Sequence, residues 1–360
     1  MKKGYIFSWF NSGRNYGQTL QAYALQRVLT DMEYDVKHIC FESNRYPSMS
    51  VLRKLKDLIR LTKSQRTVQS KFDKFICENM KVTNRLNSNK QVQKFISRNK
   101  PDFLICGSDQ VWNPYNIHPF YFLANIGDES VRRVAYAVST CDEKRKGKFL
   151  DYPEIKGWIR QIDYIYVREN SGKRIFSDLF DVSSEVVLDP TLLLSGKEWI
   201  DKLKLKTYSD NYVLCYAFNL TAEQERIISK RAKELNCKIK YGNIINENDI
   251  KKEQWSPIEF LEAILNAKEV FTDSFHGTAF SILFHKNFIV FDNGEDEKSD
   301  AYYNIDRMNT LLNLIGLSHR LMLKTSPNMT NKEDIDFSMV DSILNKRRKE
   351  CLFMLRRSIE

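Results

Sequence analysis

The sequence has no long apolar run. Among its 360 residues, no stretch approaches the roughly 18 apolar residues that a membrane-spanning helix needs, and the run from Tyr5 to Phe10 is too short for the core of a signal peptide. Cysteine is also sparse. The seven cysteines are odd in number and form no C-x-x-C pair, which indicates reduced thiols and not a disulfide framework. We therefore expect a soluble cytoplasmic protein.

Several motifs of well-known chemistry are also missing. There is no G-x-x-x-x-G-K followed by Ser or Thr, no H-E-x-x-H, no cluster of Cys and His, and no G-x-S-x-G. A D-x-D triplet, Asp334 to Asp336, lies in a polar stretch and is more typical of a helix start than of a metal site. These absences argue against a P-loop enzyme, a zinc peptidase and an α/β-hydrolase, and we expect no metal and no cofactor.

The charge balance is basic, with 56 Lys and Arg against 46 Asp and Glu and a net charge of +10. Such an excess suits nucleic acid, an anionic membrane surface or an anionic substrate, or it keeps the surface solvated. No helix-turn-helix, RNP or zinc-finger pattern is present, so we expect no nucleic-acid partner. Charge alone does not choose among the remaining explanations.

Strands and helices alternate along the chain, which predicts an α/β protein with two Rossmann-like lobes. The expected strands are 5–10, 36–41, 103–106, 131–138, 164–167, 186–188, 212–218, 238–241, 270–272 and 288–291. The expected helices include 18–32, 222–235, 257–267 and 274–284.

The predicted domain organisation follows from this order and from the length, which is too great for one ordinary core. We expect a first lobe at 1–200 with a basic helical insertion at about 48–100, then a polar linker at 202–211. A second lobe at 211–320 and a helical tail at 321–360, packed on the first lobe, complete the chain.

Polar, turn-forming residues follow the expected strands of the first lobe. They are Gly107 to Asp109, Ser139 and Thr140, Arg168 and Glu169, and Asp189 and Pro190. In a parallel α/β sheet, ligands bind outside the carboxyl ends of the strands. Loops are polar in any case, so the pattern favours a binding edge without requiring one.

In the second lobe, the segment from Val270 to Thr278 reads as a strand that ends just before a helix. Asp273 or Ser274 can cap that helix, and the backbone N–H groups of its first turn form an anion site. His276 would lie in this turn, where an imidazole can donate a proton or hold a phosphate. Gly277 would let a ligand approach the backbone. The alternative is a capped core helix with a satisfied histidine.

Two segments of the first lobe also have candidate roles. Arg168 can grip a carboxylate with its two-pronged guanidinium, or it can pair with Glu169 at the surface. The run from Gly107 to Pro114 combines amides, a carboxylate and Trp112, the mixture that a sugar site needs. It can equally be a turn beside a core tryptophan.

Two basic stretches have an amphipathic pattern. Residues 51–63 carry Arg53, Lys54, Lys56, Arg60 and Lys63, and the C-terminal stretch carries Lys346, Arg347, Arg348, Arg356 and Arg357. Either can lie on an anionic membrane surface, or pack on the protein with its basic side solvated.

Five motifs occur in a characteristic order. They are Asn15-Tyr16-Gly17-Gln18-Thr19-Leu20-Gln21-Ala22-Tyr23-Ala24-Leu25, Gly107-Ser108-Asp109-Gln110-Val111-Trp112-Asn113, Val167-Arg168-Glu169, Asp189-Pro190, and Asp273-Ser274-Phe275-His276-Gly277-Thr278. This ordered set resembles the polysaccharide pyruvyl transferase family, over roughly residues 4 to 318.

The resemblance implies a GT-B-like fold and a reaction in surface polysaccharide biosynthesis, as for a capsule or exopolysaccharide. Phosphoenolpyruvate would be the pyruvyl donor, and a sugar with two hydroxyl groups, soluble or lipid-linked, would be the acceptor. The products would be a pyruvate ketal and phosphate. The first lobe would bind the acceptor and the second lobe the donor.

The resemblance also implies roles for single residues. His276 would be the catalytic acid or a phosphate contact. The donor-binding residues would be Arg168, Ser274, Phe275, Gly277 and Thr278, and the acceptor-binding residues would be Asn15, Tyr16, Gly17, Ser108, Asp109, Gln110, Trp112 and Asn113. Many relatives carry an arginine just before the dipeptide that includes the histidine. This chain has Ser274-Phe275 there, so another Lys or Arg would have to supply that contact.

Two other functions remain open from the sequence. A GT-B glycosyltransferase that uses a nucleotide sugar would share the fold and the anion site, and fold alone cannot separate the two. A catalytically idle sugar-binding homologue would explain the missing arginine.

Overall fold

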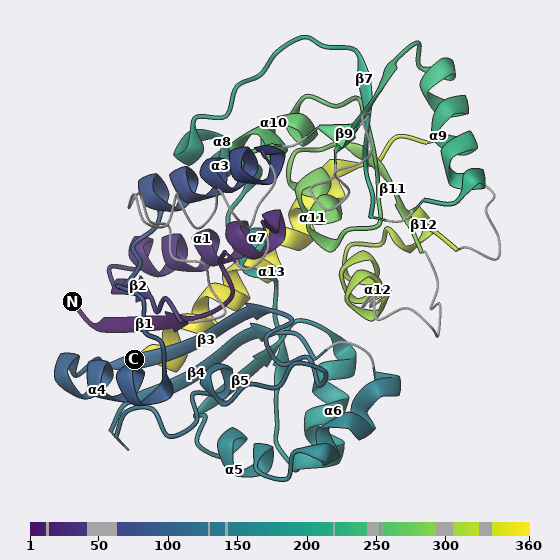
Figure 1. Cartoon of the computed structure of the whole chain (residues 1–360). Coiled ribbons are helices and arrows are strands. Elements are labelled where there is room, and N and C mark those ends of the chain that lie inside the picture. Colours follow the sequence, from purple (N-terminus) through teal and green to yellow (C-terminus); the bar gives the residue numbers. More distant parts are fainter. Residues whose placement is uncertain are drawn as a thin grey trace. The chain divides into compact units, whose positions relative to one another are not determined.

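The fold is seen in a computed structural model of the whole chain (Figure 1). The structure describes residues 1–11, 14–41, 63–128, 130–140, 143–218, 220–242, 252–253, 255–292, 305–323 and 333–360. Most of the basic stretch 51–63 lies outside the described residues, so the alternatives for that stretch stay open.

The chain forms two compact units, each built on one sheet. The first unit comprises Met1–Ser48, Ile76–Leu193 and Lys346–Glu360, and the second comprises Met49–Phe75 and Leu194–Asn345. Strand order is β2-β1-β3-β4-β5-β6 in one sheet and β12-β11-β10-β7-β8-β9 in the other. All of the neighbouring strands within each sheet are parallel. This confirms the predicted α/β fold with two parallel-sheet domains.

The first sheet contains β1 (Lys3–Phe7), β2 (Asp35–His38), β3 (Phe103–Asp109), β4 (Arg132–Val138), β5 (Tyr164–Val167) and β6 (Glu185–Val186). The α-helices of this unit include α1 (Tyr16–Asp31), α4 (Asn89–Asn99), α5 (Ile155–Ile159), α6 (Asn170–Phe180) and α7 (Pro190–Leu193). Every residue of β3 is buried, as expected for a central strand that is covered on both faces.

The second sheet contains β7 (Tyr212–Tyr216), β8 (Lys238–Gly242), β9 (Lys252–Glu253), β10 (Glu269–Thr272), β11 (Asn287–Phe291) and β12 (Leu321–Met322). Its helices include α8 (Gly196–Leu203), α9 (Ala222–Glu234), α10 (Pro257–Leu265), α11 (Phe275–Leu283) and α12 (Ile305–Leu314). Helices α8, α9 and α10 each begin with a capping box, at Ser195, Thr221 and Ser256. These caps satisfy amide groups that the first turn leaves without helical partners.

Strand β3 is longer than the sequence predicts. Gly107 and Asp109 pair with Tyr136 and Val138 of β4, so the Gly107–Asp109 segment is the end of the strand and not a loop after it. A Cβ on Gly107 would lie 2.3 Å from a methyl carbon of Leu25, so this position has no room for a side chain. The glycine is therefore explained by the packing of α1 on β3.

The two units divide the chain differently from the expected domains. Helix α3 (Lys63–Asn79) begins in the second unit, whereas the sequence places residues 48–100 in the first lobe. Lys71 on this helix forms an ion pair of 2.8 Å with Glu259 of α10. Phe72 and Phe75 are buried. An amphipathic pattern shows that a helix has an apolar face, but not which domain that face covers.

The expected helical tail at 321–360 begins with strand β12 of the second sheet, and its long helix is α13 (Phe337–Ile359). Residues from Lys346 onward belong to the first unit. In Figure 1 this yellow helix runs past the strands of the first sheet. The Tyr166 hydroxyl donates to the carbonyl of Met354, and the amide of Leu188 donates to Sγ of Cys351. The tail therefore completes the packing of the first unit.

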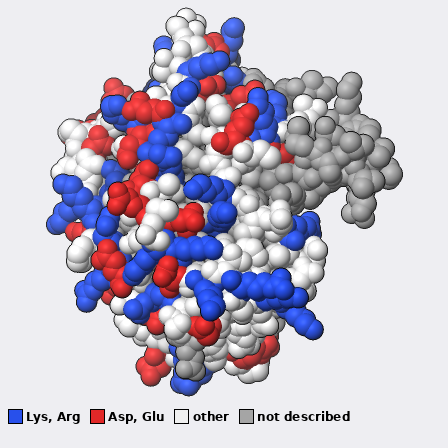
Figure 2. Space-filling view, turned by 90° about the vertical axis from the view of Figure 1, so that its left-hand side faces the viewer, with Lys and Arg blue, Asp and Glu red and all other residues white. Residues whose placement is uncertain are grey.

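Two basic residues of α13 form contacts with other parts of the first unit. Arg347 donates to the carbonyl of Val186, and Nε of Arg348 donates to the carbonyl of Leu192 at 2.9 Å. On the face shown in Figure 2, Lys and Arg side chains are interspersed with Asp and Glu side chains. These contacts favour the packed-helix explanation for Arg347 and Arg348. No helix among the described residues is long and apolar enough to span a bilayer.

Candidate functional site

The second unit places the His276 segment at the carboxyl end of β10. The strand ends at Thr272, Ser274 is the N-cap, and α11 begins at Phe275. The Ser274 hydroxyl accepts the amide N–H of Gly277 at 3.3 Å. Of the two caps that the sequence allows, the serine is the one used, because Asp273 has another role.

Asp273 links the segment after β10 to the segment after β7. Both of its carboxylate oxygens lie 3.0 Å from the amide nitrogen of Phe218, just after β7. The Thr272 hydroxyl donates to the carbonyl of Tyr216 at 2.6 Å. Bonds from the neighbouring strand thus fix the position of the α11 N-terminus. A fixed N-terminus keeps its amide groups preorganised for an anion.

His276 is the second residue of α11 and is 7% exposed. Its ring meets the ring of Phe275 edge to face, with centroids 5.3 Å apart. The first-turn amides of a helix point out of its N-terminus and carry part of its positive dipole. An imidazole here can act on an anion held by that terminus.

Gly277 and Thr278 serve the helix itself. A Cβ on Gly277 would lie 2.4 Å from Oγ1 of Thr272, so glycine is needed for α11 to pack on β10. The Thr278 hydroxyl donates to the carbonyl of Ser274 at 3.1 Å. The close approach at Gly277 is therefore between β10 and α11, whereas the sequence predicts that a ligand approaches the backbone there.

Arg168 lies at the carboxyl edge of the first sheet and is surrounded by carboxylates. It hydrogen-bonds Asp189 at 3.0 Å and lies 3.8 Å from both Asp109 and Glu169. Its side chain is 1% exposed, and the three acidic neighbours raise the pKa of the guanidinium despite burial. The guanidinium is therefore neither open to a ligand nor part of a surface ion pair. We call Arg168 and its three acidic neighbours, Asp109, Glu169 and Asp189, the Arg168 network.

Other polar groups complete the Arg168 network. Ser108 donates to Asp189 at 2.9 Å, and the amide of Thr140 donates to Glu169 at 2.7 Å. Ser108 and Asp109 have positive φ angles of 21° and 65°, an uncommon conformation for residues with a side chain. Asp109, with 11% of its side chain exposed, is the carboxylate of this network that reaches solvent most. The network brings together three of the motifs that the sequence singles out.

Trp112 is a core residue. It is fully buried, stacks on Phe122 at 4.8 Å, and donates from Nε1 to the carbonyl of Tyr121 at 2.7 Å. Its ring is thus occupied by protein, so of the two explanations that the sequence allows, the structure favours the core tryptophan. Asn113 is also buried, and its side-chain Oδ1 accepts the backbone N–H of Tyr115. Gln110, beside it, is half-buried.

The Asn15–Gly17 segment is the start of α1. Asn15 is exposed and caps the helix by accepting the amide of Gln18 at 3.2 Å. Tyr16 and Gly17 are buried. This segment and the Arg168 network both belong to the first unit.

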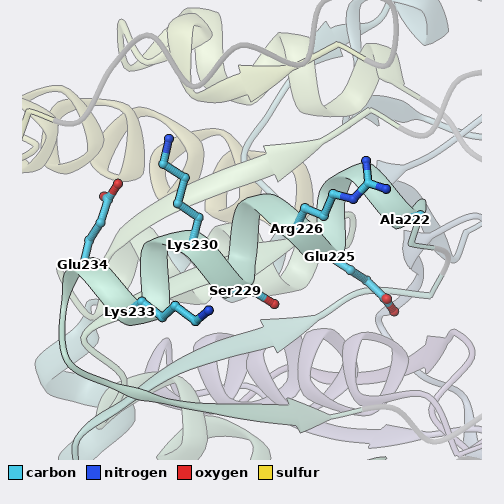
Figure 3. A pocket seen from close by; sticks show the side chains of 7 residues that line it. All are labelled: Ala222, Glu225, Arg226, Ser229, Lys230, Lys233 and Glu234. Carbon is cyan, nitrogen blue, oxygen red and sulfur yellow. The ribbon is translucent and has the colours of Figure 1, made fainter.

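A hollow of about 680 Å³ lies along the outer side of α9 (Figure 3). Its lining residues are Ala222, Glu225, Arg226, Ser229, Lys230, Lys233 and Glu234. Figure 3 shows their charged side chains spreading to both sides of one helix. They carry charges of both signs and include none of the motif residues, so we do not place the site there.

One residue near α11 is not singled out by the sequence. Arg307 of α12 has its guanidinium carbon 5.9 Å from the centre of the Phe275 ring. The sequence pattern does not predict α12, and nothing in the order of residues links position 307 to position 275.

A family model described as polysaccharide pyruvyl transferase matches residues 15–295. No curated protein matches the chain by sequence. Among solved structures, the UDP-GlcNAc 2-epimerase of Methanocaldococcus jannaschii is similar at 12% identity with a TM-score of 0.54, over 99% of each chain. An α-glucosyltransferase in complex with UDP and DNA is similar at 10% identity with a TM-score of 0.52, also over 99% of each chain. These likenesses show a GT-B-type fold.

Proposed function

The chain belongs to the polysaccharide pyruvyl transferase family, and from that premise we propose that it moves a pyruvyl group from phosphoenolpyruvate to two hydroxyls of a sugar. The observation that supports this most is the position of His276, in the first turn of α11 at the carboxyl end of β10. There a proton donor and a helix N-terminus act on the same anion. The Arg168 network would line the acceptor side of the first unit.

The proposed chemistry begins with protonation of C3 of the enol, for which His276 is the acid. C2 then becomes an oxocarbenium-like centre, and a sugar hydroxyl adds to it. The bond from C2 to the phosphate oxygen breaks, and phosphate leaves with its electron pair. The second hydroxyl closes the ketal. The two hydroxyl protons balance the one gained at C3 and the one that leaves with phosphate.

The roles in this step follow from the placement of each group. The α11 N-terminus would stabilise the charge that grows on the departing phosphate. Asp109 would accept a hydrogen bond from a sugar hydroxyl, since a carboxylate is an acceptor only. Arg168 would position Asp109 and Asp189 without touching the pyruvyl donor, because its guanidinium already faces three carboxylates.

Phosphate release tests this function directly. The protein would be incubated with phosphoenolpyruvate and a panel of sugar acceptors, and phosphate and ketal products would be measured together. We expect acceptor-dependent phosphate release in a 1:1 ratio with ketal. Release without ketal, or no release with any acceptor, would count against the proposal.

A nucleotide-sugar glycosyltransferase is the second candidate, since the similar α-glucosyltransferase structure contains UDP. Thermal melting separates the two. A rise in Tm with phosphoenolpyruvate and none with UDP is expected; the reverse result would favour the glycosyltransferase.

A further inference from the structure

Helix α11 has no lysine or arginine of its own. Its sequence is FHGTAFSIL, in which the single titratable side chain is His276. Phosphoenolpyruvate carries a phosphate and a carboxylate. A site for both anions needs more positive potential than one imidazole and a helix terminus worth about half a charge provide. A further cation therefore has to come from another element.

Arg307 of α12 lies in position to be that cation. Its guanidinium carbon is 5.9 Å from the centre of the Phe275 ring, within the range of a cation–π interaction. Phe275 in turn meets the imidazole of His276 edge to face. The three side chains form a continuous series, which we call the Arg307–Phe275–His276 row.

Burial makes this row a defined platform. Phe275 is 3% exposed and His276 is 7% exposed, whereas Arg307 is half-buried. The buried ring limits where the guanidinium can lie, and partial desolvation strengthens its interaction with the ring. Guanidinium N–H groups lie in one plane and match the two oxygens of a carboxylate. An ammonium group would not have this geometry.

We propose that Arg307 binds the carboxylate of the pyruvyl donor, with Phe275 as its platform, while the α11 N-terminus receives the phosphate and His276 remains the acid for C3. This inference rests on the proposed function and assigns the donor site to groups of the second unit alone. It also gives the carboxylate a partner other than Arg168, which is occupied by Asp109, Glu169 and Asp189.

Equilibrium binding tests the inference without turnover. Titration calorimetry with the full chain would measure Kd for phosphoenolpyruvate and, separately, for inorganic phosphate. We expect Arg307→Ala to weaken phosphoenolpyruvate binding by about 10- to 100-fold, the loss of a charge-assisted hydrogen-bonded pair. Phosphate binding should change less than about threefold. Equal weakening of both ligands would overturn the assignment to the carboxylate.

Two further variants and one control variant complete the test. Arg307→Lys retains the charge and should still weaken phosphoenolpyruvate binding several-fold, so it answers the question if Arg307→Ala fails to fold. Phe275→Leu keeps an apolar side chain but removes the ring, and it should also weaken phosphoenolpyruvate binding. Arg226→Ala is the matched control, because Arg226 on α9 is a surface arginine of the same unit with 79% of its side chain exposed. Its Kd values should equal those of the wild type.

The outcomes separate this inference from the proposed function. If the wild type binds phosphoenolpyruvate through Arg307 yet releases no phosphate with any acceptor, the function fails and the inference stands. If the wild type turns over and Arg307→Ala keeps an unchanged KM for phosphoenolpyruvate, the inference is overturned and the function stands.

Discussion

His276 and His285 stand near opposite ends of α11 and make a matched pair. His276 is in the buried first turn, whereas His285 follows the helix, has 49% of its side chain exposed and pairs with Asp341. We expect His276→Ala to lower kcat by about 10²- to 10⁴-fold, the usual range for loss of a general acid. His285→Ala should remain near wild-type activity. Near wild-type turnover in His276→Ala at saturating donor would make His276 a structural residue.

Arg168 contributes to stability through the charges that it neutralises. Arg168→Met would leave Asp189, Glu169 and Asp109 close together without their shared cation. Removal of one member of a buried ion pair typically costs about 3–5 kcal/mol. We expect a loss of that size in urea denaturation, partly recovered in the double variant Arg168→Met with Asp189→Asn. Unchanged unfolding would show that the network is not energetically coupled.

His38 makes the first unit sensitive to acid. Its Nε2–H donates to the carbonyl of Ala22, so Nδ1 accepts from the Ser8 hydroxyl, and both bonds use the neutral ring. Complete burial lowers its pKa from 6.5 to about 3. Because the unfolded state takes up the proton first, stability is fully present above about pH 6.5 and falls as the pH decreases toward about 3.

The pH dependence of unfolding checks this. Between pH 6.5 and 4.5 we expect His38 to contribute a slope of up to about 1.4 kcal/mol per pH unit in the free energy of unfolding. His38→Gln can keep an acceptor and a donor but cannot titrate, so its slope should be shallower. An identical slope in the two proteins would contradict the prediction.

At the scale of elements, a comparison of two helix caps distinguishes the effect of a cap on stability from its effect on ligand binding. Ser195 caps α8 within a capping box, and Ser274 caps α11. Replacing either serine by alanine should cost about 1 kcal/mol of stability. Only Ser274→Ala should also weaken phosphate binding, because it loosens the turn that carries His276. Calorimetry on both variants tests this; equal phosphate affinity in the two would remove the α11 terminus from the site.

The register of strand ends explains why the candidate groups gather where they do. Strands β3, β4 and β5 are parallel neighbours, so the residues after or at their carboxyl ends meet at one edge. Ser108, Thr140 and Arg168 come from these three strand ends and join one network of hydrogen bonds and ion pairs with Asp189 and Glu169. The spacing of these residues along the sequence does not show that they meet, but the parallel pairing of the strands brings them to one edge of the sheet.

At the scale of the whole molecule, peripheral contact with an anionic membrane stays a prediction that concerns residues 51–63. Each Lys or Arg near such a surface contributes about 1 kcal/mol, so several would give weak, salt-sensitive docking. We expect co-sedimentation with phosphatidylserine vesicles at low salt that fades as salt is added. The variant with Lys54→Glu and Arg60→Glu should lose it. Absence of sedimentation at low salt would indicate a soluble acceptor.

Much of the fold is readable from the sequence because its signals are local. Alternating apolar strands and amphipathic helices predict two parallel sheets, and Ser274 before a helix predicts a capped α11 with His276 in its first turn. The short strands β9 and β12 are not predicted, because two-residue strands leave no periodic pattern. The helix α12 is not predicted either, although its buried residues Met308, Leu311 and Leu312 recur at helical spacing. Domain membership of α3 is also missed.

The sequence by itself determines most of the elements, the order of the motifs and hence the family. Tertiary structure alone decides which of those residues face one another. It buries Trp112 in the core, surrounds Arg168 with three carboxylates and brings Arg307 to Phe275. The physical reason is that caps, strands and helices depend on neighbours along the chain. Burial and ion pairing depend instead on partners that only packing brings together.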